Sequence, residues 1–215
     1  MDLQNVAVGT SVTELRDVIV AASVTGNGAV VYGNAVYSQT CEMDNVTYQN
    51  GGASFQGWPI DFGAADAVLA SLCGNITALQ ANGDVVVDET GLQLTGTDPD
   101  ANVFDVSAEN LGLGIAISFS MPKGATAIVR VAGSGVTMSG LKVYLGDASP
   151  KKVMWSLCDT QNLIVEGAVS GTILAPPAYV EAGNAAIEGT LAATSVNGTI
   201  TTKTALFSGC IPVAY

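Results

Sequence analysis

A short pattern near the C-terminal end of the chain occurs twice, 18 residues apart. The first copy comprises Val169, Gly171, Thr172, Ile173 and Ala175, and the second comprises Ile187, Gly189, Thr190, Leu191 and Ala193. Eighteen residues are enough for one coil with three sides, each a strand of about four to six residues that rises about 3.3 Å per residue. The spacing therefore predicts a mainly β protein, an irregular parallel β-solenoid (a triangular β-helix) with glycine or small polar residues at its corners.

The composition is apolar for a chain without an evident membrane span. Hydrophobic residues make up 48% and charged residues 12% of the 215 residues, with a mean hydropathy of +0.41. The most apolar stretch, Leu111–Met121, is interrupted by glycine and serine, so we predict no span. No linker divides the chain, which predicts a single domain over residues 1–215. The apolar surplus must then be buried in the core or against further copies of the protein.

Charge and residue usage exclude several functional classes. The net charge of −12 and the isoelectric point near 4.1 oppose nucleic-acid binding, because the seven Lys and Arg residues form no basic stripe. The chain has no histidine, which removes histidine-dependent nucleophilic sites and HExxH zinc sites. No carboxylate pair is singled out by its spacing. We expect no enzymatic activity, no catalytic residues, no cofactor and no metal. The acidic stretch with Asp98, Asp100 and Asp105 favours a turn at Asp98-Pro99 over a calcium site.

One segment has helical rather than β periodicity. Apolar residues recur at intervals of three and four between Asp61 and Ala81, at Phe62, Ala65, Leu69, Leu72, Ile76 and Leu79. Asp61 is a candidate N-cap, and Gly74 could bend the helix or end it early. Short β-type runs lie on both sides, at 18–20, 30–32, 35–37, 85–87, 92–94, 103–106, 115–119, 127–131, 143–145, 153–157, 163–165 and 173–175. We expect one long helix packed alongside the solenoid, with a β-sandwich as the alternative fold.

Four cysteines and three sequons fit an extracellular protein. Cys41, Cys73, Cys158 and Cys210 are widely spaced and form no CxxC pair, so two disulfides are the simplest interpretation and free thiols the alternative. Three connectivities are possible, of which we choose Cys41 with Cys73 and Cys158 with Cys210. Possible glycosylation sites are Asn45, Asn75 and Asn197, each of which begins an Asn-x-Ser/Thr sequon.

Several segments together resemble a known family. They are Pro59–Phe62, Leu94–Pro99, Asn102–Phe104, Lys152–Trp155, the GTILAP run at Gly171–Pro176, the GTLA run at Gly189–Ala192, and Phe207–Gly209. In this order they resemble the choice-of-anchor A domain, and the layout is also similar to microbial ice-binding proteins. The resemblance implies a secreted surface module. For the second group it implies an irregular triangular β-helix with a long helix beside it.

These observations lead to three functional hypotheses. The first is a non-enzymatic extracellular structural or adhesive module at the cell surface that binds copies of itself in a fibre, appendage or surface layer. The second is ice binding through a short threonine face, with candidates Thr199, Thr201, Thr202 and Thr204. Threonines two apart on a strand share a face, so only Thr199 with Thr201, or Thr202 with Thr204, do so, and ordinary β-propensity is the alternative explanation. The third is glycan binding on an aromatic platform that includes Trp58 and Trp155, for which burial is the alternative.

Overall fold

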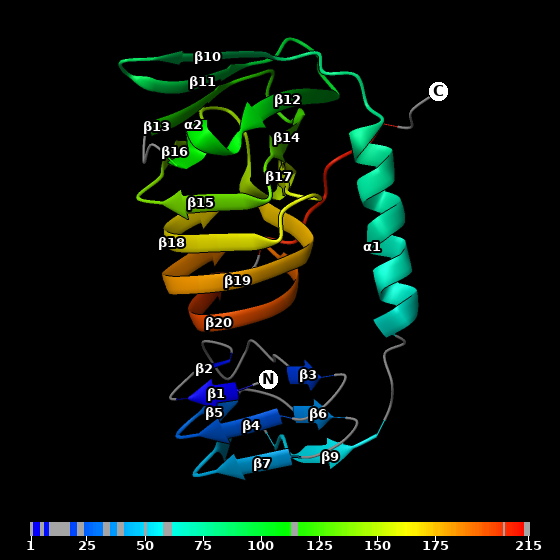
Figure 1. The fold of residues 1–215 in the computed structure, drawn as a ribbon, viewed down its shortest axis with the longest axis vertical. Helices are drawn as coiled ribbons and strands as arrows, with labels where there is room; N and C mark the ends of the chain where they lie inside the picture. Colours follow the sequence, from blue (N-terminus) through cyan, green and yellow to red (C-terminus); the bar gives the residue numbers. More distant parts are fainter. Residues whose placement is uncertain are drawn as a thin grey trace. The chain divides into compact units, whose positions relative to one another are not determined.

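The structure is a computed structural model. It describes residues 2–4, 7–8, 18–20, 24–31, 35–37, 41–49, 51–57, 62–112, 116–203 and 205–212. The chain divides into two compact units, Met1–Ala67 and Val68–Tyr215, which Figure 1 draws from blue to red. The prediction of a single domain over residues 1–215 stays a prediction.

The first unit is built of short parallel strands. They are β1 (Asp2–Gln4), β2 (Ala7–Val8), β3 (Val18–Val20), β4 (Val24–Asn27), β5 (Val30–Val31), β6 (Ala35–Tyr37), β7 (Cys41–Asp44), β8 (Thr47–Tyr48) and β9 (Ser54–Gln56). Each run of three consecutive strands contributes one strand to each of three sheets, in the orders β1-β4-β7, β2-β5-β8 and β3-β6-β9. The strands predicted at 18–20 and 35–37 are confirmed, and the third, at 30–32, is described over Val30–Val31.

The predicted long helix is confirmed as α1 (Phe62–Thr77). The helix continues through Gly74, so this glycine does not end it, and Asp61 lies outside the described residues. Ile76 and the following Leu79 are buried, and Leu69 and Leu72 are partly buried in the same cluster. These four side chains pack against one face of the sheet of the second unit, at Val103, Ile128, Met154 and Leu174. The apolar stripe of the helix therefore covers this sheet face.

The second unit holds the remaining elements. They are β10 (Asp84–Asp88), β11 (Gly91–Thr95), β12 (Ala101–Ser107), α2 (Ala108–Gly112), β13 (Ala116–Ser120), β14 (Thr126–Ala132), β15 (Gly135–Ser139), β16 (Lys142–Tyr144), the 3-10 helix η1 (Pro150–Lys152), β17 (Val153–Ser156), β18 (Asn162–Ser170), β19 (Thr172–Glu188) and β20 (Leu191–Lys203). A seven-stranded sheet runs β12-β14-β17-β19-β18-β15, with β20 on β19, and a four-stranded sheet runs β10-β11-β13-β16. Only the β10–β11 pair is antiparallel among the described strand pairs.

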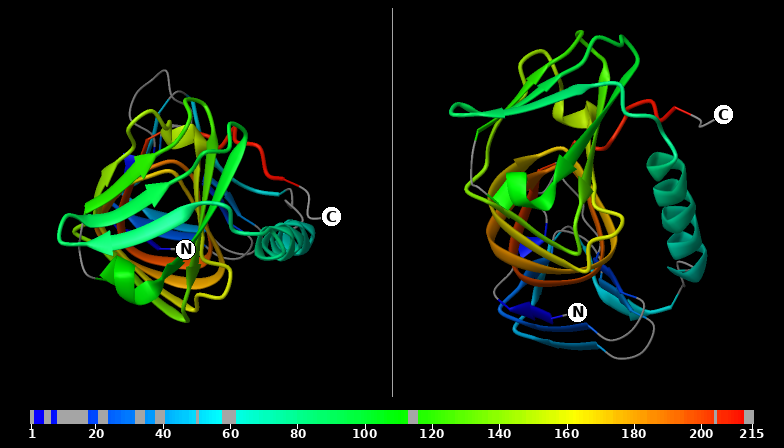
Figure 2. Two further views of the ribbon diagram at one scale, coloured as in Figure 1. Left: turned by 90° about the horizontal axis from the view of Figure 1, so that it is seen from above. Right: turned by 45° about the horizontal axis from the view of Figure 1, so that its top comes forward.

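The resulting architecture is mainly β, a largely parallel sheet that curls, with few helices. Figure 2 shows the long strands β18, β19 and β20 curving round rather than lying flat. Parallel pairing is the opposite of what the alternative β-sandwich of antiparallel layers requires, so the sandwich is wrong for the second unit. Among the described residues, no helix combines the length and apolarity that a membrane crossing needs.

The core is arranged in columns because the parallel strands stack in register. Phe104, Val129, Trp155, Ile173 and Leu191 lie one above the other on five successive strands. The first four are fully buried and Leu191 is partly buried. The indole of Trp155 also meets the ring of Phe119 edge-on, with centroids 6.0 Å apart, and its Nε1 donates to the carbonyl of Ser170 at 2.9 Å. Burial of these side chains stabilises the second unit.

The 18-residue pattern proves to be a structural repeat. Val169 pairs with Ile187, Ile173 with Leu191 and Ala175 with Ala193, so equivalent residues stack directly on neighbouring strands. Position 189 requires glycine, because a Cβ on Gly189 would lie 2.1 Å from the carbonyl oxygen of Gly171. The 18-residue spacing in the sequence therefore equals the spacing between these register partners of β19 with β18 and β20.

Candidate functional site

Three of the four threonine candidates lie on β20, and two of them lie on opposite faces of it. Thr201 pairs with Ala186, which pairs with Ala168, while Thr202 pairs with the buried Ile187. Successive side chains on a strand point to opposite faces, so Thr201 faces outward and Thr202 faces the core side. Thr199 lies on the same strand and is exposed, and Thr204 lies outside the described residues. The outward column that contains Thr201 is completed by alanines.

The cysteine pairing that we chose is wrong. Cys73 is bonded to Cys158, with their Cα atoms 5.7 Å apart, whereas Cys41 and Cys210 are free thiols. Cys73 follows Leu72 on the covering face of α1, and the packing of that face on the sheet brings it beside Cys158, the second residue after the end of β17. A signal was present in the sequence, because positions 69, 72, 73 and 76 form one helical stripe.

The sequon asparagines, the tryptophans and Asp98 lie in different environments. Asn45, Asn75 and Asn197 are all exposed, in a turn, on α1 and on β20 respectively. Trp155 is fully buried, so burial rather than glycan stacking is confirmed for this residue, and Trp58 lies outside the described residues. The turn at Asp98 is confirmed, because its Oδ1 accepts from the backbone N–H groups of Asp100 and Ala101.

An acidic hairpin end is also ordered by its own hydrogen bonds. Asp88 Oδ1 accepts from Thr90 Oγ1 at 2.6 Å, from the Thr90 backbone N–H at 2.7 Å and from the Gly91 N–H at 3.2 Å. The side-chain bond from Thr90, followed by the backbone bonds, lowers the pKa of the Asp88 carboxyl from its ordinary value. This carboxylate stabilises the turn between β10 and β11.

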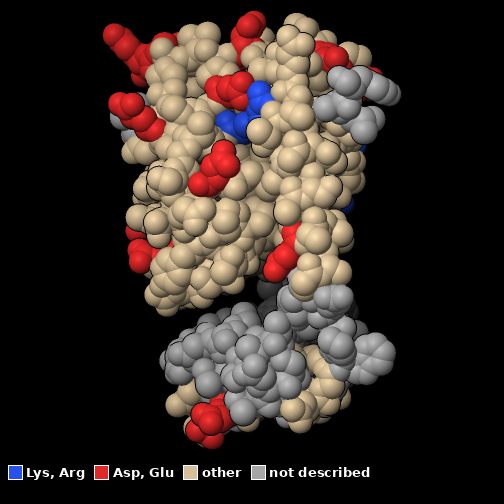
Figure 3. Space-filling model, turned by 45° about the vertical axis from the view of Figure 1, so that its right-hand side comes forward, with Lys and Arg blue, Asp and Glu red and all other residues tan. Residues whose placement is uncertain are grey.

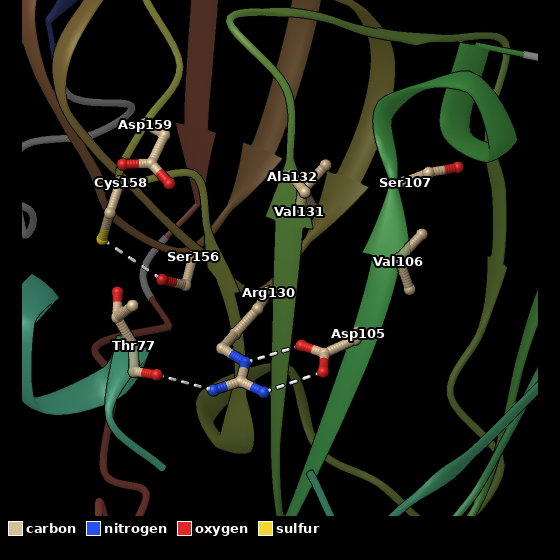
Figure 4. A pocket seen from close by; sticks show the side chains of 10 residues that line it. All are labelled: Thr77, Asp105, Val106, Ser107, Arg130, Val131, Ala132, Ser156, Cys158 and Asp159. Carbon is tan, nitrogen blue, oxygen red and sulfur yellow. Dashed lines mark hydrogen bonds and ion pairs between the residues drawn. The ribbon is translucent and has the colours of Figure 1, made fainter. Parts of the chain in front are cut away.

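A cavity of about 400 Å³ that the sequence did not predict lies at the C-terminal end of α1. Figure 4 shows its polar groups on neighbouring strands: Asp105 from β12, Arg130 from β14, and Ser156 with Asp159 at the end of β17. Arg130 Nε donates to Asp105 Oδ1 at 2.7 Å and Nη2 donates to Oδ2 at 2.9 Å. The two residues are register partners, so the strand pairing itself sets this contact.

Arg130 also holds the end of the helix. Its Nη1 donates to the carbonyl oxygens of Ile76, Thr77 and Leu79, at 3.2, 3.1 and 2.6 Å. The last carbonyls of a helix have no partner within the helix and carry partial negative charge, which a cation satisfies. Arg130 and the Cys73–Cys158 disulfide therefore fasten the same end of α1 to the sheet.

On β20, the last strand of the second unit, a side chain on the core-facing side is exposed to solvent. Val136, Leu163, Val180 and Val196 form one column; the first three are at most 2% exposed, but Val196 on β20 is 47% exposed. Among the described strands, β20 pairs only with β19. The face drawn in Figure 3 carries scattered acidic side chains on a surface that is mostly uncharged. A strand edge with an exposed valine and a sparsely charged surface are both suited to contact with another surface.

Comparisons with known proteins give a family and a weak likeness to a solved structure. A family model described as "Putative Ice-binding-like adhesive domain" matches residues 3–203. No curated protein matches the chain. Among solved structures, the chain is similar to an ice-binding protein from the Antarctic ascomycete Antarctomyces psychrotrophicus, with 16% identity, a TM-score of 0.34, and coverage of 96% of this chain and 93% of that one.

Proposed function

The chain belongs to the ice-binding-like adhesive domain family, and from this premise we propose that it is a non-enzymatic extracellular adhesive module that acts by surface contact. The proposal includes kinship with the choice-of-anchor A domain, on the motifs named above, and an irregular triangular β-solenoid as the complete fold. The Cys73–Cys158 disulfide supports an oxidising, extracellular location. The absence of histidine from the sequence supports a role without catalysis.

The exposed Val196 and the unpaired edge of β20 support the proposal that the module assembles with copies of itself. Val196 exposes an apolar side chain whose equivalents on the preceding strands are buried, next to a strand edge with no described partner. A β-strand edge of a second copy would satisfy the backbone groups of β20 and cover Val196 together. Head-to-tail contacts of this kind build fibres or layers when they do not close.

Sedimentation of the full chain over a concentration series, with electron microscopy of the concentrated sample, tests this assembly. We expect Val196→Lys to weaken association at least about tenfold, because it places a charge in the contact. The matched control is Ile164→Lys, since Ile164 is 37% exposed on the opposite face of β18. A wild-type chain that stays monomeric at high concentration refutes assembly.

A second candidate function is ice contact on the outward column Ala168, Ala186 and Thr201. These small side chains stack on neighbouring strands, which lie about 4.8 Å apart, and form a column of short side chains. Thermal hysteresis of the wild-type chain tests this function. If the column contacts ice, Thr201→Tyr abolishes the activity, whereas Thr137→Tyr, on β15, preserves it. Equal activity of the two variants contradicts this face.

A further inference from the structure

The cavity at the end of α1 has the size and the polar groups of a small-ligand site. Its volume of about 400 Å³ falls within the range of roughly 300–1,000 Å³ that is usual for small-molecule pockets. It lies wholly within the second unit, and its polar groups come from Thr77, Asp105, Ser107, Arg130, Ser156 and Asp159. None of these groups has a part in the proposed assembly through β20.

Arg130 and Asp105 present a hydrogen-bond donor directly beside acceptors. A guanidinium has five N–H donors, and the bonds to Asp105 and to the helix carbonyls leave one Nη2 N–H outside the contacts of the described residues. The Asp105 carboxylate is 61% exposed and keeps further lone pairs. Adjacent hydroxyl groups of a sugar match such a pair, because one can donate to the carboxylate while its neighbour accepts from the guanidinium.

Two further acceptors face the same cavity. Ser156 is 4% exposed, and its Oγ lies 3.3 Å from Cys158 Sγ. Because Cys158 is in a disulfide and has no S–H, the serine hydroxyl is the donor in that contact, and its oxygen stays available as an acceptor. Asp159 adds an exposed carboxylate on the same side, as Figure 4 shows. The cavity thus offers several acceptors and one fixed donor.

The charges that line the cavity disfavour anionic ligands. The cavity contains two carboxylates, Asp105 and Asp159, and one guanidinium, whose charge is already neutralised by its bidentate bonds to Asp105. A phosphate, sulfate or carboxylate group would therefore meet net repulsion. A neutral ligand rich in hydroxyl groups fits the acceptors without this repulsion.

We propose that this cavity binds one neutral sugar unit of a surface glycan, an inference that rests on the proposed adhesive function. Arg130 is held by the helix carbonyls, and the disulfide fixes Cys158 between Ser156 and Asp159, so the polar groups are positioned before the ligand arrives. Such preorganisation lowers the entropy lost on binding. No aromatic side chain is among the described residues that line the cavity, so we expect a single site to bind weakly and the overall affinity to rise when the module is repeated in an assembly.

The test uses the full chain and saturation-transfer NMR with glucose, galactose, mannose and N-acetylglucosamine, with glucuronic acid as the anionic comparison. We expect binding of at least one neutral sugar, no binding of glucuronic acid, and amide shifts confined to 105–107, 130–132 and 156–159. Asp159→Ala is expected to weaken binding about tenfold, the loss of one charged hydrogen bond. Ala132→Glu, at an exposed position on β14, is expected to abolish it.

Asp147→Asn is the matched control, since Asp147 is an exposed acid that does not line the cavity. The inference is overturned if no neutral sugar binds at about 10 mM, or if both cavity variants bind like the wild type. If sugar binding fails while the chain still assembles or adheres to a surface, only this site is wrong. If the wild-type chain neither assembles nor adheres to a surface, the proposed function is wrong.

Discussion

Removal of the Cys73–Cys158 disulfide should lower the stability of the protein markedly. The two cysteines are 85 residues apart in the sequence, so the bond closes a long loop in the unfolded chain. The chain-entropy relation gives about 4–5 kcal/mol for a loop of this length, as an upper value. For a chain of this size, each 1 kcal/mol corresponds to roughly 2–4 °C, so Cys73→Ala/Cys158→Ala should lower Tm by roughly 8–20 °C.

Thermal unfolding followed by circular dichroism measures this effect. Cys210→Ala is the control, because Cys210 is an exposed free thiol, and it should melt like the wild type. A non-reducing peptide map should show a Cys73–Cys158 cross-link, with Cys41 and Cys210 open to alkylation. The reasoning is refuted by a map that links Cys41 to Cys73, or by a double variant that melts within about 2 °C of a correctly bonded wild type.

Three further predictions concern local contacts. Arg130→Met should destabilise the chain by about 1–3 kcal/mol in denaturant titration, because the last carbonyls of α1 lose a charged donor. Gly189→Ala should cost about 1–3 kcal/mol, since its Cβ would meet a carbonyl oxygen, whereas Gly135→Ala, with open space around it, should be close to neutral. Thr90→Ala should raise the pKa of Asp88 in an NMR titration. Because the folded pKa is the lowered one, the stability that Thr90 contributes is present at neutral pH and is lost as the pH falls through that pKa.

Local patterns were sufficient to predict most elements of the fold. The stripe from Leu69 to Leu79 identified α1, and β-branched runs between glycines identified most strands, because both signals depend only on neighbouring residues. The repeat was visible in only one place for a physical reason. Trp155 and Ile173 are 18 positions apart, as are Ile173 and Leu191, but Phe104 and Val129 are 25 apart and Val129 and Trp155 are 26 apart. A search for a fixed period cannot find columns whose spacing changes.

The candidate site was much less predictable. Asp105 and Arg130 meet because they are register partners on β12 and β14, and neither residue is distinguished by its local sequence. The disulfide pairing likewise required knowing which sheet face α1 covers. The separation of Thr201 from Thr202 onto opposite faces of β20 could be predicted, because it follows from strand alternation alone.

The changing column spacing shows where this scaffold accepts extra sequence. The stretch of chain from Val129 to its register partner Trp155 is eight residues longer than the stretch from Trp155 to Ile173. Residues 145–152, between β16 and β17, are eight residues outside the paired strands. They close on themselves through hydrogen bonds from Ala148 N to the Leu145 carbonyl and from Lys152 N to the Ser149 carbonyl. Foreign peptides grafted between Asp147 and Ser149 should therefore be displayed to solvent while the paired strands keep their register. This loop would then be a suitable point for labelling or engineering the protein.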